Sequence, residues 1–181
     1  MREFFTADLH FGHGNILDYC DRPFKNAEHM NKRLIDEINM RCKPEDTLYH
    51  NGDFCCYGKV RGVEGMRHPA SFYEGQIKCK VIHIMGNHDK NNKVKGSLYG
   101  AFMMLGKYQA WVQHKPPWDD LNGGFKIPDQ VSAYICGHVH EKWKVEKWKG
   151  KPVINVGCDQ WDYRPISKDE LIGVISKELR K

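Results

Sequence analysis

The chain has 181 residues, a formal net charge of +5, 40% hydrophobic residues and 28% charged residues. These proportions are typical of soluble globular proteins, and the length suits one domain with a sizeable core, so we expect a single domain over residues 1–181. The positive charge favours an anionic ligand but is too small to indicate a nucleic-acid-binding protein. No apolar run is long enough to span a bilayer, and the first residues lack the apolar core of a signal peptide. We therefore expect no membrane partner and a cytoplasmic location.

The chain contains seven cysteines, an odd number, and no C-x-x-C pair occurs. Cys55 and Cys56 are adjacent, which suits neither an ordinary disulfide nor a zinc finger. This pattern predicts free thiols in a reducing compartment.

The first predicted strand covers residues 4–9, and a helix follows over residues 27–42. Apolar side chains recur every four residues along that helix, and Pro44 ends it. The side chains concerned are Met30, Leu34, Ile38 and Cys42. Four further runs, residues 47–50, 81–85, 109–112 and 133–136, are short and rich in β-branched or aromatic residues, which predicts strands.

Residues 143–156, with Gly150 in the middle, predict a β-hairpin. Ser167 and Glu170 have the spacing of a capping box, which predicts a helix start. The apolar stripe that follows, residues 171–179, is expected to pack on a sheet. Strands interleaved with helices indicate an α/β domain, in which ligands bind where the strands end.

Polar side chains of the kinds that bind metals follow each predicted strand of the first 140 residues. They are Asp8, His10, Asp53, Asn87, His114, His138 and His140. In an extended strand, residues two apart point the same way. If extended geometry persists there, Asp8 and His10 would face one pocket, as would His138 and His140. Carboxylate, amide and imidazole ligands without thiolate favour Mn, Fe, Zn, Ni or Co, with Mn as our first choice.

Seven ligands exceed what one tetrahedral ion needs, whereas two ions that share a bridging carboxylate would use them all. Two divalent metal ions about 3.5–4 Å apart are a standard arrangement for phosphoryl transfer. In that chemistry, a hydroxide that bridges the ions attacks phosphorus in line. His88 lies between Asn87 and Asp89 and is a candidate for protonating the leaving oxygen.

The motifs D-L-H at 8–10, G-D at 52–53, G-N-H-D at 86–89, His114 and G-H-V-H at 137–140 resemble the calcineurin-like metallophosphoesterase superfamily. The stretches H-F-G-H-G-N-I at 10–16, D-R-P-F at 21–24 and N-V-G-C-D-Q-W-D-Y-R-P at 155–165 resemble its small bacterial and bacteriophage branch. A single G-N-H-D would be weak support. Five motifs in this order are strong support, and together the stretches cover nearly the whole chain.

The resemblance implies an α/β fold (α+β by some schemes), a four-layer α/β/β/α sandwich of two mixed β-sheets flanked by helices. It also implies that Asp53 bridges two ions. The first ion would be held by Asp8, His10, Asp53 and His140, and the second by Asp53, Asn87, His114 and His138. By the same resemblance His88 would be the general acid, and Asp89 is a candidate to orient His88 or its loop.

Two positions depart from the family pattern. Asn51 replaces an apolar residue, which is expected to alter packing, and Glu141 follows G-H-V-H where many relatives have glycine. Three further side chains are candidates for substrate contacts: His13, Arg22 and Arg164. Each has an alternative, since His13 could be an exposed loop residue and the two arginines could stabilise turns. We interpret residues 59–75 as a solvated surface loop, and a mobile loop that reaches substrate phosphate is the alternative.

The sequence therefore predicts a dinuclear-metal-dependent hydrolase of phosphomonoesters or phosphodiesters, with small nucleotide-type substrates as partners. A nuclease on DNA or RNA and a non-catalytic binding module on the same fold are the alternatives. The modest charge counts against the nuclease, and the complete ligand set counts against the binding module. The sequence indicates no particular oligomeric state.

Overall fold

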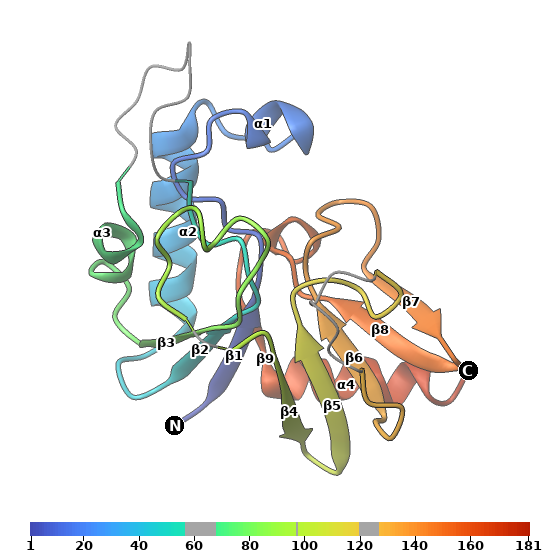
Figure 1. Cartoon of the computed structure of the whole chain (residues 1–181). Coiled ribbons are helices and arrows are strands. Elements are labelled where there is room, and N and C mark those ends of the chain that lie inside the picture. Colours follow the sequence, from blue (N-terminus) through green and yellow to red (C-terminus); the bar gives the residue numbers. More distant parts are fainter. Residues whose placement is uncertain (57–67, 97, 120–126) are drawn as a thin grey trace.

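The computed structural model describes residues 1–56, 68–96, 98–119 and 127–181. It contains two mixed β-sheets that lie side by side, with helices around them (Figure 1). The first sheet has the strand order β3-β2-β1-β9. Strands β1, β2 and β3 are parallel, and β9 is antiparallel to β1. Their bounds are Glu3–Thr6 for β1, Thr47–His50 for β2, Lys80–His83 for β3 and Ile166–Ser167 for β9.

The second sheet has the order β4-β5-β6-β8-β7. Its central strands β5, β6 and β8 are parallel, while β4 and β7 are antiparallel to their neighbours. The bounds are Gly100–Leu105 for β4, Tyr108–Gln113 for β5, Ala133–Cys136 for β6, Val145–Trp148 for β7 and Lys151–Asn155 for β8. Strands β7 and β8 form the hairpin that the sequence predicts over residues 143–156.

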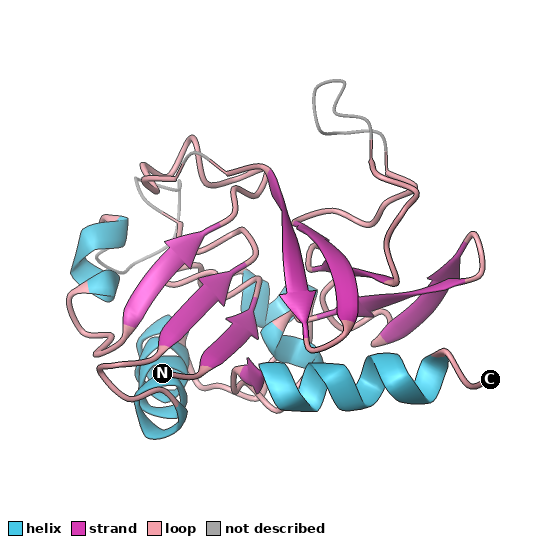
Figure 2. Cartoon of the chain, turned by 90° about the horizontal axis from the view of Figure 1, so that it is seen from below, coloured by secondary structure: helices cyan, strands magenta, loops and turns pink. Residues whose placement is uncertain are grey.

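Four helices and one 3₁₀ turn complete the described structure. They are α1 (Ile16–Tyr19), α2 (Ala27–Arg41), α3 (Ala70–Glu74), α4 (Lys168–Glu178) and the turn η1 (Cys158–Gln160). Helix α2 covers the outer face of the first sheet, whereas α4 extends from the first sheet across to the second (Figures 1 and 2). The capping box that the sequence predicts at Ser167 and Glu170 begins α4.

Alternating residues of β1 connect the layers. Phe4 packs with Met30, Leu34 and other residues of α2 in one buried cluster. Phe5 points the opposite way, into a second cluster that joins both sheets to α4. A strand that buries both faces in this manner must lie inside a layered domain, because successive side chains point to opposite sides. The family's expected arrangement, two mixed sheets flanked by helices, is confirmed.

The sequence analysis did not predict β4, β9, α1 or α3. Strand β9 has two residues and α1 has four, so neither shows a periodic pattern that a sequence can reveal. Most of the surface loop predicted over residues 59–75 lies outside the described residues, although α3 occupies its end. Among the described helices, none is long and apolar enough to cross a membrane.

Candidate metal centre

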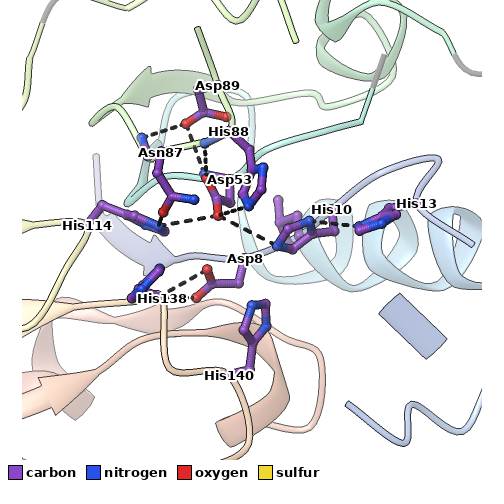
Figure 3. Close-up of polar contacts among 12 residues, drawn as sticks. Asp8, His10, His13, Asp53, Asn87, His88, Asp89, His114, His138 and His140 are labelled. Atoms are coloured by element: carbon purple, nitrogen blue, oxygen red, sulfur yellow. Dashed lines mark hydrogen bonds and ion pairs between the residues drawn. The ribbon is translucent and has the colours of Figure 1, made fainter. Parts of the chain in front are cut away.

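The loops that follow β1, β2, β3, β5 and β6 converge at one place between the two sheets (Figures 1 and 3). These strands are parallel within their sheets, so their carboxyl ends meet at a common edge. Every metal-type side chain that the sequence predicts is brought to this edge. They are Asp8, His10, Asp53, Asn87, His114, His138 and His140.

The side chains form two groups that could each hold a metal ion. Asp8, His10 and His140 make the first group, and Asp53, His114 and His138 make the second. Within each group, the potential ligand atoms all lie within 4.8 Å of one another. Asn87 joins the second group, because its Oδ1 lies 3.1 Å from Nε2 of His114.

Asp53 lies between the two groups. Its Oδ2 is 3.3 Å from Nε2 of His114 in the second group and 3.8 Å from Nε2 of His10 in the first. The carboxylate is buried, with its side chain 2% exposed. One carboxylate oxygen can therefore reach ligands of both groups, as a bridging ligand must.

The backbone that presents these side chains is not extended. Asp8, His10, Asp53, His138 and His140 all have positive φ angles, between 49° and 71°. The extended geometry that would align Asp8 with His10, and His138 with His140, does not persist there, because β1 ends at Thr6 and β6 at Cys136. Left-handed conformations are uncommon outside glycine but are enriched in Asp and His, and they concentrate at functional sites. Here they turn the side chains of short loops toward a common point.

Two glycines allow the loops to approach so closely. A Cβ atom at Gly52, whose φ is 94°, would collide with the imidazole of His114, and one at Gly86 would collide with Asp53. Any side chain at these positions would push a ligand candidate out of place.

Asp89 holds two of these loops together. Its buried carboxylate accepts hydrogen bonds from the backbone N–H groups of Asp53 (2.9 Å), Phe54 (2.8 Å) and Gly86 (2.8 Å). A carboxylate that accepts several backbone hydrogen bonds fixes the geometry of the loops that donate them. Asp89 thus links the loop that carries Asp53 to the loop that begins at Gly86 and carries His88.

The donor set fits divalent metal ions on structural grounds. Nε2 of His10 is buried and has no hydrogen-bond partner among the described residues. An orphaned buried nitrogen costs free energy unless a ligand satisfies it. Nδ1 of His114 donates to the carbonyl oxygen of Asn51 (2.7 Å), so Nε2 becomes the electron-pair donor when this imidazole gives up its second proton to bind a metal. Imidazole, carboxylate and amide donors match borderline transition metals.

Burial and neighbouring charges shift the pKa values of the ligand candidates in different directions. Burial alone would raise the pKa of the Asp53 carboxyl, but the hydrogen bond and charge of His114 outweigh burial and hold that pKa well below its ordinary value. Burial raises the pKa of Asp8 to about 6. Burial together with the charges of His114 and Lys115 lowers the pKa of His138 to about 4, which keeps that imidazole neutral and able to bind a metal.

The carboxylate of Asp159 contacts His140, a member of the first group, at the ring nitrogen Nδ1. It lies in the turn η1, and its Oδ2 is 3.4 Å from Nδ1 of His140. Asp159 is not among the site residues that the sequence predicts. It lies within the stretch N-V-G-C-D-Q-W at 155–161, which carries part of the family resemblance. A single Asp in a loop gives no signal of its own, so only the fold reveals its contact with His140.

Arg22 does not face the candidate metal centre. Its side chain is buried and forms two hydrogen bonds with Asp159, both 2.8 Å, and a third with the backbone oxygen of Asp8 (2.7 Å). The expectation that Arg22 contacts substrate is not supported, because its donors are occupied inside the protein. The alternative, a residue that stabilises a turn, describes its position better.

The other two substrate candidates also have partners within the chain. Nδ1 of His13 lies 3.2 Å from Nδ1 of His10, beside the first group. Arg164 donates to Glu170 (3.0 Å), which is the capping residue of α4, so this guanidinium stabilises a helix start. Asn51 is fully buried, and its side-chain amide has no partner among the described residues. Glu141 is exposed.

His88 stands at the open side of the site. Its side chain is 57% exposed, and Nε2 lies 3.9 Å from Oδ2 of Asp53. Its backbone N–H donates to the other oxygen of the same carboxylate (3.0 Å). The imidazole is thus anchored through its backbone beside both groups while its ring remains accessible to a ligand (Figure 3).

Residues 1–168 match the family model for the calcineurin-like phosphoesterase superfamily domain, and the chain therefore belongs to that superfamily. An uncharacterized protein of Methanocaldococcus jannaschii is 30% identical over 183 residues, which cover 98% of this chain and 93% of that protein. The gene 66 protein of Mycobacterium phage L5 is 23% identical over 199 residues, which cover 95% of this chain and 93% of that protein. These matches confirm the resemblance drawn from the five motifs.

One solved structure has the same fold over nearly its whole length. It is a protein of unknown function from Aquifex aeolicus, with a TM-score of 0.68 and 23% sequence identity. The alignment covers 96% of this chain and 98% of that one. At this level of identity the similarity supports the fold.

Proposed function

We propose that this protein is a dinuclear-metal-dependent hydrolase of phosphoester bonds that acts on small phosphomonoesters or phosphodiesters. The observation that carries the proposal is the position of Asp53, whose Oδ2 lies 3.3 Å from His114 and 3.8 Å from His10. A shared carboxylate between two ligand groups is what a two-metal hydrolytic site requires. Membership in the calcineurin-like phosphoesterase superfamily supports the same chemistry.

The residues divide between two ions. Asp8, His10 and His140 would hold one ion, His114, His138 and Asn87 would hold the other, and Asp53 would contact both. The candidate ions are Mn, Fe, Zn, Ni and Co, since the ligands are nitrogen and oxygen atoms. Mn is our first choice. When bound, the two ions would supply Lewis-acid activation of water and would neutralise charge on the phosphoryl oxygens.

The protein's own residues orient the reactants and move a proton. His88 is the proposed general acid, which transfers a proton from its imidazole to the leaving oxygen of the ester. Its exposure suits this role, because a proton donor must reach a substrate that enters from solvent. Asp89 keeps the Asp53 loop and Gly86 in register, so that His88 and the ligand groups retain their spacing.

Small substrates fit the charge of the chain. A net charge of +5 over 181 residues is modest, and nuclease activity on long DNA or RNA generally needs a concentrated basic surface. The protein's seven cysteines are all free thiols, which supports a reducing compartment such as the cytoplasm.

A metal-reconstitution assay tests the proposal. Metal-free protein is supplied separately with Mn, Ni, Zn and Mg and assayed on p-nitrophenyl phosphate, bis(p-nitrophenyl) phosphate, cyclic nucleotides and labelled oligonucleotides. We expect turnover of a small ester with at least one metal, and loss of that turnover in Asp53→Ala.

Absence of turnover with every metal and substrate would reject the enzyme and favour the binding module. Faster cleavage of oligonucleotides than of small esters would favour the nuclease. Asp36→Ala, at an exposed position on α2, is the control for loss of a carboxylate.

A further inference from the structure

A cavity of about 190 Å³ adjoins the second ligand group. Asn87 and His114 belong to its wall, so the cavity and the candidate metal centre share two side chains. In Figure 3 these two side chains lie together, on the side of the centre away from His10 and His13. A substrate held at the centre can therefore extend into this cavity.

Two lysines from different loops line the same cavity. Lys90 follows Asn87 by three residues in the loop after β3, and Lys115 directly follows His114 after β5. Among the described residues, no carboxylate lines the cavity and neither lysine forms an ion pair. The wall is thus positively charged and not neutralised by the part of the chain that the structure describes, which suits an anionic group.

The two arginines that the sequence suggests as substrate contacts already form ion pairs with carboxylates. Arg22 is bound to Asp159, and Arg164 is bound to Glu170. Lys90 and Lys115 therefore supply positive charge beside the centre that remains available to a ligand.

The size of the cavity restricts what it can hold. Pockets for drug-sized ligands have volumes of about 300–1,000 Å³, so 190 Å³ suits a smaller group than a nucleoside. A phosphate group fits both the small volume and the two ammonium groups. Tyr99 and Met85 also line the cavity, and neither side chain is negatively charged.

We propose that this cavity binds a second phosphate group of the substrate, next to the phosphate that is hydrolysed. The proposal rests on the proposed function and narrows its substrate class to small molecules with two neighbouring phosphate groups, such as phosphoanhydrides and bisphosphates. Lys90 and Lys115 are then specificity-determining residues, because they recognise the group that a simple phosphomonoester lacks.

Competition by two inhibitors tests the proposal. The Mn-loaded protein hydrolyses bis(p-nitrophenyl) phosphate as a reporter, and inhibition constants are measured for inorganic phosphate and for methylenediphosphonate. We expect the bisphosphonate to bind about tenfold more tightly than phosphate, since one added charged hydrogen bond accounts for about that factor. In the double variant Lys90→Gln/Lys115→Gln, this ratio is expected to fall to about two or less.

Matched variants distinguish an effect of the two cavity lysines from an effect of the protein's overall charge. Lys90→Arg/Lys115→Arg keeps both charges and is expected to retain most of the preference. Lys107→Gln/Lys177→Gln removes the same charge from exposed positions elsewhere and is expected to keep the full preference. Metal chelation by the bisphosphonate affects all variants equally, so it cancels when the ratios are compared.

Equal inhibition by the two compounds in the unaltered protein would overturn the proposal, as would an unchanged ratio in the glutamine variant. Failure of the proposed function has a different signature, the absence of reporter turnover. In that case, calorimetric titration of the Mn-loaded protein with methylenediphosphonate tests the cavity directly. Binding that the glutamine variant loses would support the cavity, and no binding would reject it.

Discussion

The Asp159 carboxylate lies 3.4 Å from Nδ1 of His140 and accepts two hydrogen bonds of 2.8 Å from the buried guanidinium of Arg22. Arg22 fixes the carboxylate, and the carboxylate in turn orients the imidazole. An imidazole whose Nδ1–H donates to a carboxylate presents Nε2 as a more basic metal ligand. Asp159 and Arg22 therefore act on the candidate metal centre through His140 and do not belong to either ligand group.

Asp159→Asn is expected to weaken metal binding by about 10–100-fold, since the loss of a carboxylate that orients a ligating histidine typically has an effect of this size. The measurement is isothermal titration of metal-free protein with Mn. Asp162→Asn, an exposed position three residues later, is the control and is expected to bind Mn like the unaltered protein. Equal affinities in both variants would show that Asp159 has no role in positioning His140.

Arg22→Met is expected to lower the free energy of unfolding by about 3–5 kcal/mol, because it leaves the buried Asp159 carboxylate without its partner. Urea denaturation of the metal-free protein measures this change. Lys32→Met removes the exposed ion pair with Asp36 on α2 and is expected to cost at most about 1 kcal/mol. If Arg22→Met left stability unchanged and raised only KM, the residue would be a substrate contact after all.

The sequence motifs single out side chains that the structure brings together, because each motif follows a parallel strand of its sheet. Strands β2 and β6 and helix α2 also match the predicted ranges closely, since their apolar patterns are regular. The conformation of the loops could not be predicted. The positive φ angles of Asp8 and His138 follow from how the two sheets meet, which no local pattern encodes.

The residues that contact substrate could not be predicted from the sequence either. Arg22 and Arg164 are reasonable candidates by residue type, because guanidinium groups bind phosphate. In the structure, however, Arg22 is paired with Asp159 and Arg164 with Glu170 of the α4 capping box. The partner of Arg22, Asp159, lies 137 residues away along the chain. Conversely, Lys90 and Lys115 had no motif of their own, and only the cavity between their loops singles them out.

His88→Ala is expected to reduce turnover of esters with poor leaving groups by about 10²–10⁴-fold, because these leaving oxygens need a proton in the transition state. Turnover of p-nitrophenyl esters is expected to fall less, since p-nitrophenolate leaves without protonation. Metal content, measured by mass spectrometry, is expected to remain unchanged. His29→Ala, at an exposed position on α2, is the control. A uniform loss for all leaving groups would contradict the proton-donor role.

Asp46 is expected to make stability depend on pH. Burial would raise its pKa, but hydrogen bonds from the backbone of Arg2 (2.7 Å) and Lys43 (3.0 Å), and from the Arg2 side chain, lower it from 3.8 to about 2. A lowered carboxyl pKa adds stability above the unfolded value, and this contribution is lost as the pH falls through the folded value. It is therefore complete above about pH 5 and disappears between about pH 4 and 2.

The test is the difference in Tm between the unaltered protein and Asp46→Asn across that range. We expect the variant to melt at a lower temperature at pH 7, and the difference to shrink as the pH falls below 4. Asp18→Asn, at an exposed position in α1, provides the comparison. A difference in Tm that increased as the pH fell would contradict the assignment of a stabilising, ionised carboxylate to Asp46.

The central claim is that Asp53 joins two metal ions, and anomalous diffraction from crystals of the Mn-loaded protein tests it most directly. The account predicts two anomalous peaks per chain. One is expected among Asp8, His10 and His140, the other among Asn87, His114 and His138, and both beside the carboxylate of Asp53. A single peak, or two peaks of which only one contacts Asp53, would contradict it.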